Sequence, residues 1–64
     1  MSKLEIMNDL NKIMDKYPLS LGEIAVKINV SFMTIYRWKN GLAAPRSHLV
    51  LDAYKKFTTE FPIE

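Results

Sequence analysis

The chain has 64 residues, no cysteine and a single histidine, which excludes a disulfide framework, a thiolate metal site and a conventional zinc site. So short a sequence predicts one domain, 1–64, whose small core depends on tight helix packing or on a second subunit. No apolar run approaches the roughly 20 residues that cross a bilayer, and Glu5 stands where a signal peptide would be apolar. We therefore expect a cytoplasmic protein that uses no cofactor, metal or membrane.

The net charge of +2 is unevenly distributed along the chain. Residues 1–26 carry three basic and four acidic side chains, residues 27–56 carry six and one, and residues 57–64 carry two acidic ones. The three segments therefore have charges of −1, +5 and −2. A basic middle between acidic ends indicates contact with a polyanion. A solvated basic face without a partner explains the charge equally well, so other features must decide.

The first element is a helix over about 3–17. Ser2 and Glu5 fit a capping box at its start, and Pro18 closes it. Apolar residues recur at spacings of three and four, as on one face of a helix. They are Leu4, Met7, Leu10, Ile13, Met14 and Tyr17.

The second element is a shorter helix over about 21–28. Ser20 and Glu23 make a second capping box, and Leu19 stands where a hydrophobic staple begins. Asn29 ends the helix at a turn that requires positive φ, which Asn tolerates better than most residues other than Gly. One face of this helix is apolar and is made by Leu21, Ile24, Ala25 and Ile28.

A third helix, over about 32–40, is capped by Ser31 and stopped by Gly41, the preferred residue for a left-handed helix end. After a short connection, a fourth helix is predicted over about 46–57. Its inward side chains are expected to be Leu49, Val50, Ala53, Tyr54 and Phe57. No segment has the pattern of a strand, so the sequence predicts an all-α fold.

The tail 58–64 is too short to fold alone. Its apolar residues Phe61 and Ile63 are expected either to pack back on the bundle or to swap across a dimer. Fraying of the terminus is the alternative.

The second and third helices together meet the requirements of a helix-turn-helix. Ala25 is small where the two helices cross, and Asn29 serves the tight turn between them. Two helices joined at a steep angle by so short a turn place the second one in the major groove of DNA. The positions that fill the angle between them are all apolar: Ile24, Ile28, Val30, Ile35 and Trp38.

Three stretches carry a resemblance to a known family: Leu19–Ala25, Ile28–Ser31 and Thr34–Gly41, followed by Pro45. They resemble the lambda-repressor and Cro-like helix-turn-helix family over about residues 4–57. The resemblance implies a compact bundle of four or five helices that binds DNA as a homodimer. It also implies regulation of transcription, as a repressor, in a phage or a bacterium.

The resemblance implies base contacts by Phe32, Met33, Tyr36 and Arg37, and Arg is the commonest partner of guanine. It also implies backbone contacts early in the third helix, at its end and after it. With general attraction of lysine to phosphate, the expected backbone contacts are Ser31, Lys39, Asn40, Arg46 and Lys27.

Two departures from the family pattern concern the contacts with DNA. Leu21 stands where the family often has a Gln that binds the backbone, and Leu cannot make this contact. Phe32 and Met33 stand where polar base readers are usual. Apolar side chains can contact the methyl group of thymine, so steps that contain thymine are plausible targets.

The sequence therefore predicts a sequence-specific, non-enzymatic regulator that binds double-stranded DNA as a homodimer. Two alternatives stay open: a protein-interaction module on the same fold that uses Phe32 and Met33, and a recombination directionality factor that bends DNA. No small-molecule ligand is evident. An enzyme is disfavoured, because no paired carboxylates mark a pocket and no nucleophile has a base partner.

Overall fold

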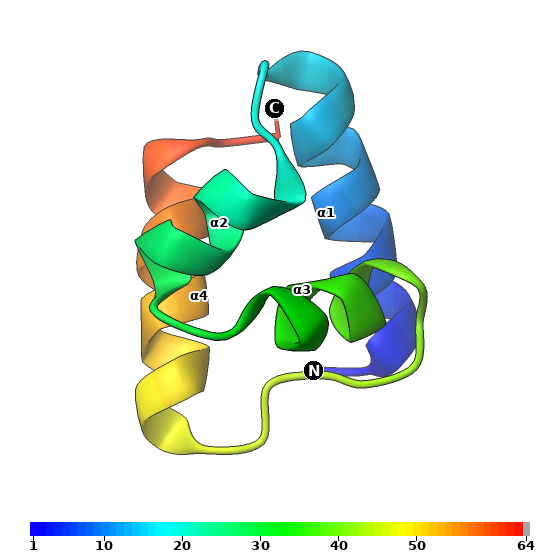
Figure 1. Cartoon of the computed structure of the whole chain (residues 1–64), viewed down its shortest axis with the longest axis vertical. Coiled ribbons are helices and arrows are strands. Elements are labelled where there is room, and N and C mark those ends of the chain that lie inside the picture. The colour runs from blue at the N-terminus through cyan, green and yellow to red at the C-terminus, as the bar shows by residue number, and fades with distance from the viewer. Residues whose placement is uncertain (64) are drawn as a thin grey trace.

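The computed structural model describes residues 1–63 and shows, within them, four α-helices and no strand. They are α1 (Lys3–Lys16), α2 (Leu21–Ile28), α3 (Phe32–Lys39) and α4 (His48–Glu60). In Figure 1, α1 and α4 stand on opposite sides of a compact globule, and α2 and α3 lie between them. The all-α prediction is confirmed. In the part of the chain described, no helix combines the length and the apolar character that crossing a membrane requires.

Serine begins every helix. The predicted capping boxes are both present: Ser2 pairs with Glu5, and Ser20 with Glu23, through reciprocal hydrogen bonds of 3.1 Å. The hydrogen bonds from Ser2 lower the pKa of the Glu5 carboxyl. The hydroxyls of the other two caps also accept from an amide three residues on, but no carboxylate completes the box. Those two caps are Ser31 before α3 and Ser47 before α4.

Two residues with positive φ end α2 and α3. Asn29 has φ 67° and Gly41 has φ 71°, as the sequence predicted. After each of them, an amide donates to a carbonyl five residues earlier, the hydrogen bond that characterises a Schellman motif. The two bonds join Val30 to Ala25 at 2.9 Å and Leu42 to Arg37 at 2.8 Å.

The core lies where α3 meets the other helices. α3 packs against α1 and α2, and α2 packs against α4. Trp38 of α3 meets Tyr54 of α4 edge to face at 6.0 Å, and the Tyr54 hydroxyl donates to Asp9 of α1 at 3.1 Å. The fully or almost fully buried side chains are Ile6, Leu10, Ile13, Ile24, Ala25, Ile28, Ile35, Trp38, Tyr54 and Phe57.

The C-terminal residues pack back on their own chain (Figure 1). The ring of Phe61 lies 5.2 Å from that of Tyr17, edge to face, and the Tyr17 hydroxyl donates to the Pro62 carbonyl at 2.7 Å. Ile63 is half-buried against the core. Of the outcomes expected for the tail, the structure shows packing on the bundle.

Two predicted core positions are wrong. Leu4 is 61% exposed and Leu49 is 84% exposed, although both were expected to face inward. Ile6, which the predicted stripe omitted, is completely buried. The buried face of α1 runs through positions 6, 10 and 13, spaced by four and three, so Leu4 falls outside it.

The helix boundaries also differ from the prediction. α1 and α3 each end one residue earlier than expected, at Lys16 and Lys39. α4 starts two residues later, because Ser47 caps it, and it continues three residues beyond Phe57. Residues 58–60 therefore belong to the helix and not to the tail. The hydroxyls of Thr58 and Thr59 both donate to the Lys55 carbonyl, so these residues are accommodated within the last helical turns.

Two leucines on α1 offer a matched test of the packing. Leu10→Ala should lower the free energy of unfolding by about 3 kcal/mol, since Leu10 is completely buried. Leu4→Ala, in the same helix, should change it by no more than about 0.5 kcal/mol. Urea unfolding monitored by circular dichroism measures both. Equal losses of unfolding free energy in the two variants would show that α1 does not bury the face that contains Leu10.

Burial raises the pKa of the Tyr54 phenol above its ordinary value, and the negative charge of the Asp9 carboxylate, to which the phenol is hydrogen-bonded, raises it further. Below about pH 10, Tyr54 is protonated in the folded and the unfolded chain, and its contribution to stability is complete. Above that pH the unfolded chain loses this proton more readily than the folded one. Stability should therefore fall as the pH rises from 10, and less steeply in Tyr54→Phe. Thermal melting at pH 8 to 11 measures the difference, and parallel slopes would contradict it.

Candidate nucleic-acid interface

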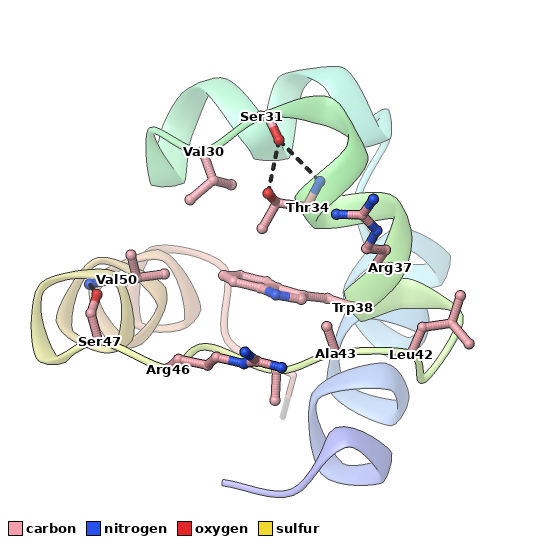
Figure 2. Close-up of a pocket in the computed structure, with 11 residues that line it drawn as sticks. Val30, Ser31, Thr34, Arg37, Trp38, Leu42, Ala43, Arg46, Ser47 and Val50 are labelled. Carbon is pink, nitrogen blue, oxygen red and sulfur yellow. Dashed lines mark hydrogen bonds between the residues drawn. The ribbon is translucent and has the colours of Figure 1, made fainter.

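A groove of about 580 Å³ lies between α3 and the segment that leads into α4 (Figure 2). We call it the α3–α4 groove. Eleven residues line it: Val30, Ser31, Thr34, Arg37, Trp38, Leu42, Ala43, Ala44, Arg46, Ser47 and Val50. One wall comes from residues 30–38 and the other from residues 42–50, two segments that the fold brings face to face.

α3 has an inner and an outer face. Ile35 and Trp38 are buried, and they fix which side of the helix faces away from the core. The outer face, as we use the term, consists of the four predicted base readers, all exposed on α3: Phe32, Met33, Tyr36 and Arg37. The first three expose 53%, 50% and 45% of their surface, and they lie together on one short helix. The structure thus gathers the predicted base readers on one surface.

Two guanidinium groups flank the α3–α4 groove. Figure 2 shows Arg37 on the α3 side and Arg46 on the loop side, with the indole of Trp38 between them. Among the residues of the groove, all of which the structure describes, the hydrogen bonds made by side chains join Ser31 with Thr34 and Ser47 with Val50, and neither involves a guanidinium group. Both guanidinium groups therefore remain available to an anion.

Two helix N-termini open onto the same groove. Ser31 precedes α3 and Ser47 precedes α4, and both line the groove. Neither helix has an acidic residue in its first turn, whereas α1 and α2 each have a glutamate there. The N-terminus of a helix carries a partial positive charge that an anion stabilises. In α1 and α2 a glutamate supplies that anion, and in α3 and α4 the chain supplies none.

The sequence around the groove contains no acidic residue at all. Between Glu23 and Asp52 lie 28 residues without Asp or Glu, and all groove residues fall within this range. The basic side chains of this stretch are Lys27, Arg37, Lys39 and Arg46. No charge in this segment opposes the approach of a polyanion to the groove.

The structure separates the predicted backbone contacts into two groups. Ser31 and Arg46 line the groove, but the other three do not. Lys27 lies at the end of α2, with its ammonium 5.2 Å from the ring centre of Phe61. Lys39 is half-buried on α3. The side-chain amide of Asn40 donates to the Tyr36 carbonyl at 2.8 Å, so it closes the last turn of α3.

Two polar groove residues, Thr34 and Ser47, were not predicted as site residues. Thr34 occupies the position that Glu5 and Glu23 hold in the first two helices, and its hydroxyl lies 2.8 Å from that of Ser31. Their signal in the sequence is the missing glutamate three residues after a capping serine. For Ser47 this signal was missed, because the fourth helix was predicted to start at Arg46 and Ser47 was not recognised as its cap.

Thr34 allows the charge of the groove to be changed without loss of the cap. Thr34→Glu and Thr34→Gln both restore a capping box at Ser31, so both should melt at about the temperature of the parent chain or higher. Only the glutamate brings a negative charge. Charges about 4 Å apart at a protein surface repel by about 1 to 4 kcal/mol, so duplex DNA should bind Thr34→Glu about tenfold more weakly than Thr34→Gln. Fluorescence titration at low salt measures this, and equal affinities would show that no phosphate approaches this turn.

The sequence matches no protein-family model, no curated protein and no solved structure. What bears on function is therefore the α3–α4 groove, its two guanidinium groups and helix N-termini, and the outer face of α3.

Proposed function

We propose that this protein is a sequence-specific regulator of transcription that binds double-stranded DNA through a lambda-repressor-like helix-turn-helix. α2 and α3 form this unit, and α3 enters the major groove. The observation that carries the proposal is the α3–α4 groove, where two guanidinium groups and two uncompensated helix N-termini lie beside an exposed helix face. A bacterium or a phage is the proposed source, and repression is the proposed effect.

The packing of α3 supports its role as the helix that reads DNA. Only the connection 29–31 separates it from α2, and Asn29 makes that connection tight. Ile35 and Trp38 hold the inner face against the core, so the outer face is presented by a rigid support. An α-helix with its side chains is about 10 to 12 Å wide, which matches the major groove of about 12 Å.

The α3–α4 groove supports a role in binding the DNA backbone. A helix that lies in the major groove has phosphates along both sides, and backbone contacts set its position. Arg37 lies on the outer face and also borders the groove, whereas Arg46 comes from the loop on the opposite wall. Arg46 is therefore the better candidate for a phosphate, and Arg37 for the edge of a guanine.

We propose binding as a homodimer, since a twofold dimer would place two copies of α3 about 34 Å apart, on successive turns of one DNA face. The preferred site would then be a pseudo-palindrome. Selection of bound sequences from a random duplex pool tests this directly, because the symmetry of the recovered motif reports the symmetry of the bound protein.

The exposure of Phe32 and Met33 also favours a second candidate function, a protein-interaction module. Half of each side chain is open to solvent, and apolar patches of this kind often mark protein interfaces. Phe32 and Met33 belong to the segment 24–51, which contains basic but no acidic residues, and this favours DNA over a protein partner. Under the second candidate, Phe32→Ser would abolish binding of a protein partner and leave any duplex affinity unchanged.

Three single-charge variants distinguish base contacts, phosphate contacts and general attraction. Arg37→Ala should weaken binding to the selected duplex by about 1 to 3 kcal/mol and relax sequence preference at one position. Arg46→Ala should weaken binding to selected and random duplexes alike and lower the slope of log affinity against log salt by about 1. Lys12→Ala removes the same charge from the exposed side of α1 and should change both quantities little.

Titrations of the Trp38 fluorescence with duplex DNA between 50 and 200 mM salt give these slopes and affinities. A parent chain that binds no duplex even at 50 mM salt would contradict the proposed function. Equal effects of Arg46→Ala and Lys12→Ala would show that the α3–α4 groove is not where the backbone binds.

A further inference from the structure

The outer face of α3 has few of the side chains that normally read bases. The helix contains no Asn, Gln, Asp or Glu, the residue types that pair with adenine and cytosine edges. Asn40, just beyond it, uses its amide to bond the Tyr36 carbonyl. Arg37 remains as a donor to guanine, and Phe32 and Met33 have no side-chain hydrogen-bonding group suited to a base edge.

The outer-face residues pair along the helix. Phe32 and Tyr36 are four residues apart, as are Met33 and Arg37, so each pair lies on adjacent turns of one side. Met33 therefore lies one turn before Arg37, the residue that the outer face shares with the α3–α4 groove, and Phe32 lies one turn before Tyr36. A helix face that carries exposed apolar side chains together with one guanidinium group fits a partner that is anionic overall but apolar at the point of contact.

We infer that the outer face of α3 reads the 5-methyl groups of thymine in the major groove, with Phe32 and Met33 in contact with these methyls. The inference rests on the proposed function and specifies the DNA that it would recognise. Thymine is the only standard base that presents a methyl group in the major groove, and the other bases present polar groups there. Opposite Phe32 or Met33, those polar groups would lose water and gain no hydrogen bond.

The same geometry relates the methyl contacts to the guanine contact. Met33 and Arg37 are four residues apart, a rise of about 6 Å along the helix, and neighbouring base pairs are about 3.4 Å apart. The recognised sequence therefore has a thymine within about two base pairs of the guanine that Arg37 contacts.

Replacement of thymine by deoxyuridine tests the inference on the unaltered protein. Deoxyuridine removes the methyl group and keeps the O4 acceptor and the base pair. The probe is the duplex recovered from the random pool, with its thymines replaced one position at a time. At each contacted position, the affinity should fall about fourfold, the value expected for loss of one buried methyl group. Replacements outside the recognised sequence should have no effect.

Side-chain variants assign each methyl to its contact. In Phe32→Ala and Met33→Ala, one position that was sensitive to deoxyuridine should become insensitive. Val26→Ala serves as the control, because Val26 is 80% exposed on α2 and lies outside the outer face; it should keep the full sensitivity. Thermal melts verify that all three variants fold, as expected for side chains at least half exposed.

The outcomes separate this inference from the proposed function. Tight binding of the selected duplex with equal affinity for thymine and deoxyuridine would overturn the methyl contacts and leave DNA binding intact. Sensitivity that persists unchanged in both Phe32→Ala and Met33→Ala would also overturn them. Failure to bind any duplex would overturn both proposals.

Discussion

The burial of Ile35 and Trp38 is the interaction on which the rest of the structure depends. These side chains, 0% and 3% exposed, fix α3 against its neighbours and determine which of its sides faces outward. Trp38 extends this role to α4 through Tyr54, whose hydroxyl is bonded to Asp9 of α1. α1 and α2 thus pack directly against a helix of eight residues, and α4 meets it through the contact of Tyr54 with Trp38. Because these two buried side chains hold α3 in one orientation, the apolar side chains of its outer face stay in solvent even though the core is small.

Charge and helix capping reinforce this division of the molecule. α1 and α2 neutralise their own N-termini with Glu5 and Glu23, whereas α3 and α4 leave theirs open on the α3–α4 groove. The acid-free segment between Glu23 and Asp52 has the same consequence over a wider surface. A serine caps every helix, so α3 and α4 are stably capped without a glutamate in the first turn. The positive ends of these two helices are therefore left for an anion. The basic segment that attracts a polyanion over a long range therefore also contains the helix N-termini and guanidinium groups that can donate hydrogen bonds to it.

The sequence predicted the local features well, because each depends on a few neighbouring residues. The caps at Ser2, Ser20 and Ser31 and the left-handed Asn29 follow from residue type and spacing alone. The burial of Ile6 in place of Leu4 could not be predicted in this way. Two overlapping apolar stripes fit α1, and only the contact with the other helices determines which one is buried. The groove between Arg37 and Arg46 likewise depends on the path of the loop into α4, for which the sequence offered only a weak boundary signal.

A chemical-shift map tests directly whether the outer face of α3 and the α3–α4 groove bind DNA. Backbone amide resonances of the labelled protein would be recorded while a duplex of random sequence, and then the selected one, is added. We expect shifts concentrated in residues 31–37 and 46–50, with small changes in α1 and along the C-terminal part of α4. Shifts concentrated on α1 or around Phe61, or no shifts at low salt, would contradict it.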